Sequence, residues 1–144
     1  MNRRVYLAAA GSAAVATVAG CTAVGEVGED LFGDPEYDIG MSRNEFLPDD
    51  FEATVGDTVV WMNTSEADHT VTAIESSVPE GADYFATGDY EDQQRAEAAW
   101  HDHHGGRLGT RDTFEHTFEL PGTYDYICVP HVRGGMVGRV IVSE

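Results

Sequence analysis

The strongest constraint on the fold is a run of short apolar and β-branched segments that fills the chain from Tyr37 to Glu144. Turn residues separate these segments, and no internal repeat or long amphipathic helix accompanies them. Strands are predicted at 37–41, 58–62, 70–74, 113–120, 123–128 and 137–142. Because successive strands without interleaved helices pack as sheets on one another, we expect an all-β domain built as an antiparallel sandwich.

One long polar segment does not fit this pattern and predicts a helical excursion at about 89–104. Asp89 could cap its N-terminus, where a carboxylate and further acidic residues in the first turn are favourable. The glycine pair that begins at Gly105 would end it. We expect Tyr90 and Trp100 to pack this helix on the sandwich.

The charge of the chain restricts its partners. Its 144 residues, enough for one domain, include 8 Lys or Arg against 26 Asp or Glu, a net charge of −18. Nucleic acids are held by Lys and Arg that neutralise phosphates, so this surface excludes a nucleic-acid binder. Removing a signal that ends at Gly20 takes two Arg and no acid, which leaves −20. Such self-repulsion is best tolerated where salt shortens the Debye length to about 3 Å, which indicates a halophilic origin.

Residues 1–20 are interpreted as an export signal, with Arg3-Arg4, an apolar stretch at 8–19 and small residues before Cys21. The arginine pair resembles the twin-arginine signal, whose machinery carries folded proteins. The residues that end at Cys21 resemble a lipobox, which implies that this Cys becomes the first mature residue and carries lipid. A transmembrane anchor is the alternative for the apolar stretch, although spanning a bilayer takes about 20 residues. A free thiol is the alternative for Cys21.

Residues 21–36 are rich in Gly, Glu and Asp, and we interpret them as a flexible, self-repelling tether. The predicted organisation is therefore an export signal at 1–20, a tether at 21–36 and one domain at 37–144. After export, the lipid would hold the domain at the extracytoplasmic face of the cell membrane.

Three side chains with metal-binding atoms follow one another near the C-terminus. Cys128, His131 and Met136 are spaced as C-x2-H-x4-M, at the end of a predicted strand and in the loop after it. Soft sulfur ligands with imidazole suit copper, and two His and one Cys with a weak axial Met form the blue-copper arrangement. The loop lacks the second His. His69 is the best source, because a sandwich brings strands that are distant in sequence side by side.

These residues resemble those of the cupredoxins, in the branch of plastocyanin and pseudoazurin, and are most similar to the halocyanins of salt-loving archaea. The match covers 37–144 and includes Gly-Asp-Thr-Val-Val-Trp within 55–63 and Met-Val-Gly-Arg-Val at 136–140. The resemblance implies a cupredoxin-type Greek-key antiparallel β-sandwich and one copper ion that cycles between Cu(II) and Cu(I). It also implies imidazole binding through the δ nitrogens, a thiolate, and an axial thioether. The implied metal ligands are His69, Cys128, His131 and Met136.

The number of candidate ligands limits the chemistry. The binuclear copper centre of oxidase subunits needs two Cys in the ligand loop, and this loop offers only Cys128. Copper nitrite reductases and multicopper oxidases need two or more such domains, for which 37–144 leaves no room. We therefore expect an electron carrier that works by outer-sphere transfer, not an enzyme. An extracytoplasmic copper storage or delivery protein is the alternative, and a structural sandwich with incidental ligands is a third interpretation.

The resemblance further implies that electrons pass through the edge of His131, exposed in a small apolar face. That face is expected to contain Pro130, Val132, Gly134, Gly135 and Val137. Plant plastocyanins have a Tyr before the ligand Cys as a second port, but Ile127 stands here, so His131 is expected to serve alone. The expected partners of this monomer are membrane redox complexes, with a quinol-oxidising donor and a terminal oxidase or a denitrification enzyme as acceptor.

Four other histidines lie in the domain. His101, His103 and His104 follow the predicted helix, where they form either a second, looser metal site or a solvated turn, and the turn is favoured. His116 lies in an alternating strand and is assigned no metal.

Overall fold

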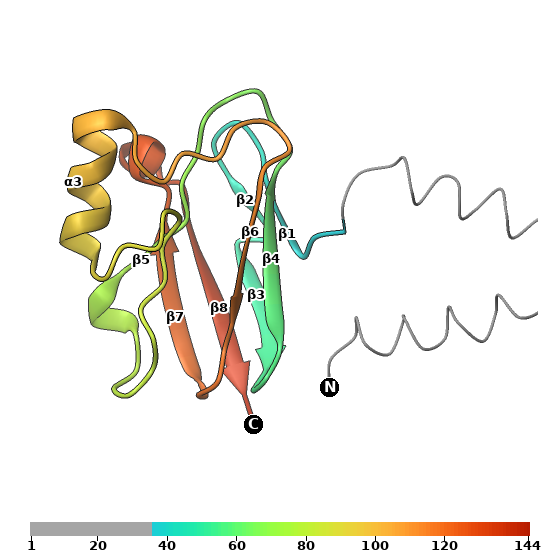
Figure 1. Cartoon of the computed structure of the whole chain (residues 1–144). Coiled ribbons are helices and arrows are strands. Elements are labelled where there is room, and N and C mark those ends of the chain that lie inside the picture. The colour runs from blue at the N-terminus through green and yellow to red at the C-terminus, as the bar shows by residue number, and fades with distance from the viewer. Residues whose placement is uncertain (1–35) are drawn as a thin grey trace, which may run out of the picture. The chain divides into compact units, whose positions relative to one another are not determined.

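Two four-stranded sheets form the framework of residues 36–144, the part of the chain that the structure, a computed structural model, describes (Figure 1). In the first sheet the order is β2-β1-β4-β6, and in the second it is β3-β8-β7-β5. The first sheet contains β1 Ile39–Met41, β2 Phe46–Leu47, β4 Thr58–Asn63 and β6 Thr113–Thr117. The second contains β3 Asp50–Thr54, β5 Thr72–Ala73, β7 Gly122–Ile127 and β8 Val137–Ser143. The predicted export signal, Cys21 and all but the last residue of the tether lie outside the described residues.

The predicted β-sandwich is present, with mixed rather than wholly antiparallel sheets. β1 runs parallel to β4, and β3 runs parallel to β8. The other neighbours pair antiparallel. This arrangement follows from two short strands, β2 and β3, that the sequence did not predict. Pro48, which has no N–H for a strand ladder, follows β2, and the chain then enters the second sheet as β3.

Aromatic side chains fill the space between the sheets. Trp61 on β4 is fully buried. The centroid of its ring lies 5.4–5.9 Å from the ring centroids of Tyr126, Phe114 and Phe85. Each buried aromatic of this size stabilises the fold by about 2–3 kcal/mol through removal of apolar surface from water. The sheets are therefore fixed relative to each other by large rigid rings, which gives the loops at their ends a firm base.

The helical excursion is present as α3, Gln93–His103, and its N-terminus differs from the prediction. Asp92, not Asp89, is the N-cap, and its carboxylate accepts a hydrogen bond from the Arg95 N–H. Asp89 instead has φ of 60°, in the left-handed region. His104, one residue before the glycine pair, ends the helix with a left-handed cap.

The packing of α3 also differs from the prediction. Ala96 and Ala99 are its buried residues, whereas Tyr90 and Trp100 are only partly buried. The Trp100 ring lies 4.5 Å from the His104 ring. α3 contacts β5 and the 3-10 turn Val129–Gly134, so small side chains bring it close to the second sheet (Figure 1). Within residues 36–144, no helix is long and apolar enough to cross a bilayer.

Candidate metal centre

Backbone hydrogen bonds within the loop after β7 hold this loop in a compact conformation. The N–H of Cys128 donates to the carbonyl of Met136 at 3.1 Å, and the N–H of His131 donates to the carbonyl of Cys128 at 3.1 Å. The N–H of Met136 donates to the carbonyl of His131 at 3.3 Å. Gly135, with φ of 92°, allows the turn that this path requires. The C-x2-H-x4-M spacing therefore gives a compact hairpin that presents all three side chains from one end of the sandwich.

His69 joins this loop from a distant part of the chain. The N–H of His69 donates to the carbonyl of Leu108 at 3.1 Å, and the N–H of Leu108 donates to the carbonyl of His69 at 2.7 Å. The hydroxyl of Thr70, the next residue, accepts a hydrogen bond from the N–H of Val129 at 2.9 Å. The segment that carries His69 is thus bonded directly to the segment that carries Cys128.

Three donor atoms converge where these segments meet. Cys128 Sγ lies 3.4 Å from Nδ1 of His69 and 3.4 Å from Nδ1 of His131. A donor atom from each residue lies within 4.8 Å of the others. The side chains of His69, Cys128 and Met136 are fully buried, while His131 is partly exposed. The predicted residues His69, Cys128 and His131 are therefore brought together, with Met136 in the same loop.

Burial shifts the pKa values of two of these groups, the Cys128 thiol and the His69 imidazole. Burial raises the pKa of the Cys128 thiol to about 11, against smaller opposing effects of hydrogen bonds from Thr70 and His131. Burial, together with the charge of His131, lowers the pKa of His69 to about 4, although the Ser42 carbonyl and Asp68 oppose this. At neutral pH, His69 is a neutral imidazole with a free lone pair, and only a metal ion that displaces the thiol proton makes Cys128 a thiolate.

The donor set fits copper. One buried sulfur and two imidazole nitrogens are the soft and intermediate ligands that copper sites use, and no carboxylate belongs to the group. Among the described residues this is the only such cluster of three or more His, Cys, Asp or Glu side chains. His101, His103 and His104 are exposed and form no comparable group within residues 36–144.

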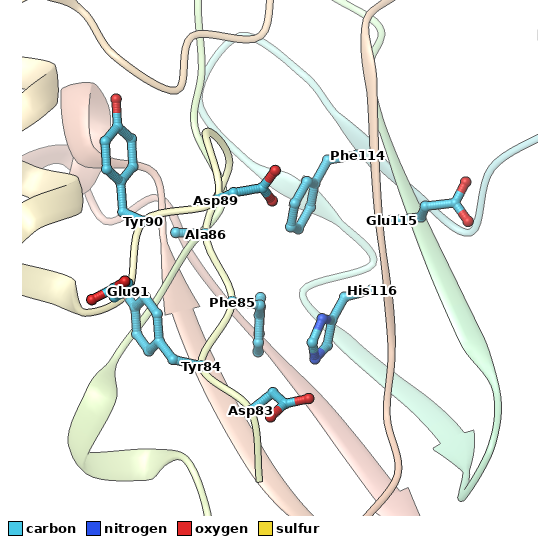
Figure 2. Close-up of a pocket in the computed structure, with 10 residues that line it drawn as sticks. All are labelled: Asp83, Tyr84, Phe85, Ala86, Asp89, Tyr90, Glu91, Phe114, Glu115 and His116. Carbon is cyan, nitrogen blue, oxygen red and sulfur yellow. The ribbon is translucent and has the colours of Figure 1, made fainter.

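A separate groove of about 450 Å³ lies between the segment 83–91 and β6 and contains none of the four candidate ligands (Figure 2). Phe114 and His116 point from β6 toward Phe85, and the rings of His116 and Phe85 stack at 4.6 Å (Figure 2). Burial lowers the pKa of His116, although Asp83 and Glu119 raise it. His116 therefore belongs to the packed wall of this groove.

Sequence reasoning missed the polar residues that support His69. Thr70 bonds to the ligand loop, and Asn63 and Ser65 form a network beside the imidazole. A small polar residue directly after the candidate ligand was a signal for Thr70. Asn63 and Ser65 gave no comparable signal, because their hydrogen bonds depend on how the loops meet.

The comparisons agree with this geometry. The copper binding proteins of the plastocyanin/azurin family match residues 35–143. Barley (Hordeum vulgare) chloroplastic plastocyanin is 32% identical over 134 residues, which cover 93% of this chain and 76% of the barley protein. Plastocyanin of Vicia faba is 31% identical over 99 residues, which cover 68% of this chain and 87% of the Vicia faba protein.

Solved structures show the same fold. A purple cupredoxin from Nitrosopumilus maritimus has a TM-score of 0.50 and 26% identity, covering 74% of this chain and all of its own. A pseudoazurin from Methylobacterium extorquens has a TM-score of 0.54 and 22% identity, covering 76% of each chain, and supports the fold alone. The predicted cupredoxin-type sandwich is confirmed. The chain belongs to the plastocyanin/azurin family of copper binding proteins and is a plastocyanin-like blue copper electron-transfer protein.

Proposed function

We propose that this chain is a membrane-tethered carrier of the halocyanin type and not an enzyme. His69, Cys128, His131 and Met136 would hold one copper ion. The donor set and the burial of Met136 in the ligand loop support this assignment. Copper bound there would supply a one-electron couple between Cu(II) and Cu(I).

A single observation carries the proposed route of the electron. Of the four side chains, His131 alone reaches the surface, while the other three are fully buried. Val137, which directly follows the ligand loop, is 47% exposed, and Pro130 and Val132 are partly exposed. A partner that docks on this apolar face would come within reach of the imidazole edge of His131, so donor and acceptor would use the same face in turn.

The chain's own residues limit rearrangement during this cycle. Backbone hydrogen bonds tie Cys128, His131 and Met136 to one another, and Thr70 ties the His69 segment to the same loop. Ligands held in this way keep their positions when the charge of the site changes, which favours fast outer-sphere transfer. A copper delivery protein would instead need ligands that release the ion.

The visible spectrum tests this function. The full chain would receive one equivalent of Cu(II) and then a mild reductant. An intense blue band that bleaches and returns on reoxidation, with copper retained, is expected, and Cys128→Ser should abolish it. Loss of the ion on reduction would favour copper delivery, and a pale spectrum in the unaltered chain would contradict the thiolate ligand.

The proposed location depends on Cys21, which would carry the lipid after export by the twin-arginine pathway. The domain would then face quinol-oxidising complexes as donors, and terminal oxidases or denitrification enzymes as acceptors, at the extracytoplasmic surface. Cys21→Ser should move the protein from the membrane fraction to the soluble fraction of the producing cell. Cys128→Ser, which alters the other cysteine, should stay with the membrane. Equal distribution of both variants would contradict the anchor.

A further inference from the structure

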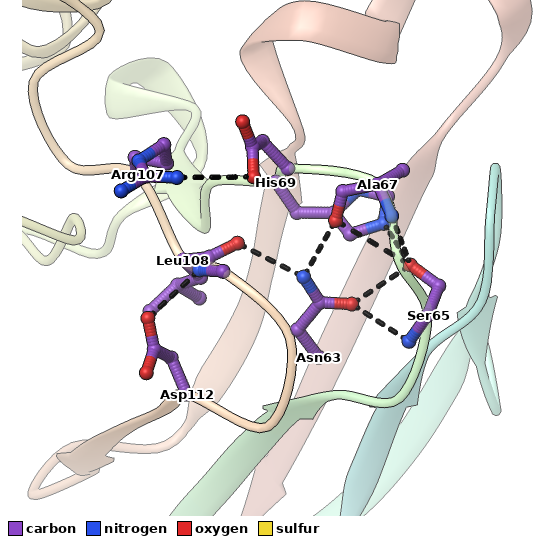
Figure 3. A network of polar contacts seen from close by, with 9 residues as sticks. Asn63, Ser65, Ala67, His69, Arg107, Leu108 and Asp112 are labelled. Atoms are coloured by element: carbon purple, nitrogen blue, oxygen red, sulfur yellow. Dashed lines mark hydrogen bonds and ion pairs between the residues drawn. The ribbon is translucent and has the colours of Figure 1, made fainter.

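A network of polar contacts links the end of β4 to the far side of the His69 ring (Figure 3). Asn63, the last residue of β4, is fully buried, and Ser65 is partly buried. The Ser65 hydroxyl lies 3.1 Å from Nε2 of His69 and 2.8 Å from Oδ1 of Asn63. The direction of each hydrogen bond in this network can be assigned from its chemistry.

The orientation of the Asn63 amide is fixed by two carbonyl groups. Its Nδ2 donates to the carbonyl oxygens of Ala67 and Leu108, at 2.6 and 2.9 Å. The opposite orientation would place Oδ1 against two acceptors and would leave the NH₂ group facing the N–H of Ser65. Oδ1 therefore accepts from the N–H of Ser65 at 2.9 Å and from its hydroxyl at 2.8 Å.

The Ser65 hydroxyl has one proton, which it donates to Asn63. Its contact with the Ala67 carbonyl is longer, at 3.5 Å. The oxygen has lone pairs left, and it accepts from the N–H of Ala67 at 3.2 Å. Toward His69 it can likewise only accept, so Nε2 must carry the proton. The lone pair of the imidazole is then on Nδ1, the atom 3.4 Å from Cys128 Sγ.

We propose that Asn63 and Ser65 are a positioning pair that holds His69 in the Nε2–H tautomer and aims its Nδ1 lone pair at the metal site. The inference rests on the proposed copper site, since it explains which nitrogen of His69 binds. His131 reaches the surface, where water can bond to its outer nitrogen. His69 is fully buried, so the protein itself has to fix its tautomer.

Three serine variants separate the positioning of His69 from a general effect on stability. Ser65→Ala removes the acceptor. Ser77→Ala is the matched control, because the partly buried Ser77 hydroxyl also donates to a carbonyl, that of Ile74, and accepts a backbone N–H, that of Asp125, away from the metal site. Ser65→Thr keeps a hydroxyl and should restore the unaltered behaviour.

The first readout needs no metal. Nitrogen-15 NMR of the imidazoles in the metal-free full chain should show one His69 tautomer, protonated at Nε2, in the unaltered protein and in Ser77→Ala and Ser65→Thr. Ser65→Ala should add a detectable population of the Nδ1–H tautomer, because the Ser42 backbone is then the only backbone partner that remains for the ring among the described residues. A single Nε2–H tautomer of His69 in Ser65→Ala would overturn the proposal, and because the measurement is made without copper, its outcome is separate from that of the proposed function.

The second readout is the affinity for Cu(I), measured by competition with a chromophoric chelator. Loss of a partner that orients a ligand His costs about tenfold or more in metal affinity. We expect a loss of about tenfold in Ser65→Ala, since the Ser42 carbonyl still interacts with the ring, and no loss in Ser77→Ala. Equal affinities of Ser65→Ala and Ser77→Ala would also overturn the proposal.

Discussion

Two backbone hydrogen bonds, to Cys128 and to His131, hold the Met136 backbone within the ligand loop. Met136→Gln should lower the reduction potential, because an amide oxygen is a harder donor and favours Cu(II) over Cu(I). Cyclic voltammetry of the copper-loaded protein measures this change. A potential that stays the same or rises would contradict Met136 as a copper ligand.

His116 predicts a pH dependence that does not involve the metal site. Burial lowers its pKa in the folded protein below 6.5, the ordinary value that the unfolded chain keeps. Below about pH 6.5 the unfolded state therefore binds more protons than the folded state, so the free energy of unfolding falls as pH is lowered. Above pH 6.5 both states carry a neutral imidazole, and this contribution to stability is fully present.

The variant His116→Phe keeps an aromatic ring against Phe85 and removes the titration. Urea unfolding of both proteins between pH 5 and 8, roughly the range of histidine titration, gives the difference in stability. The unaltered protein should lose stability relative to the variant as pH falls below about 6.5, because the variant binds no proton at this position. Parallel profiles across the range would show that His116 titrates normally.

Among single residues, the sequence predicted those whose chemistry is local. Cys128, His131 and Met136 share one loop, so their spacing alone indicated a soft-metal site. His69 was found only by asking which histidine a sandwich could bring to that loop. Asn63 and Ser65 could not be predicted, since their roles arise from hydrogen bonds that close only after β4 and the loop behind it have folded.

At the scale of elements, β7 and β8 meet so closely at one point that only glycine fits. A Cβ at Gly138 would lie 2.5 Å from the ring and hydroxyl oxygen of Tyr126. That ring cannot retreat, because Phe46 and Trp61 pack on it at 4.6 and 5.4 Å. Gly138→Ala should therefore destabilise the fold by about 1–3 kcal/mol through overpacking.

Thermal or urea unfolding measures this cost. The matched control is Gly134→Ala, where a Cβ would have no atom within 4 Å, and its stability should stay close to that of the unaltered protein. If the two alanine variants unfold alike, the contact between Gly138 and Tyr126 does not limit the packing of these strands.

The strands that the sequence missed have a common physical reason. β3 contains Asp50 and Glu52 among its five residues, and only Ala53 is buried. β2 has two residues. Segments like these pair through their backbones and show neither alternation nor an apolar run, so side-chain patterns cannot reveal them. The cap of α3 was misplaced for a related reason: four acidic residues lie at 89–97, and only the folded turn shows that Asp92 faces the N–H of Arg95.

At the scale of the whole molecule, repulsion between carboxylates is the main unfavourable charge effect. Residues 37–144 contain six Arg against 21 Asp or Glu, a net charge of −15. Raising NaCl from about 0.1 M to 1 M shortens the Debye length from about 10 Å to 3 Å. We expect the unfolding temperature to rise over this range, as proposed for a halophilic protein, and calorimetry measures it. An unfolding temperature that is constant or falls with salt would contradict a halophilic origin.

The position of β8 also determines when the domain can fold. Among the strands of residues 36–144, β8 is synthesised last, yet it lies between β3 and β7 inside its sheet, and it pairs Arg139 with Asp50 from the other end of the domain. The sheet therefore cannot form before β8 is available, and contacts so distant in sequence close slowly. The second sheet is complete only once β8 is available, and until then its unpaired strand edges are prone to aggregation.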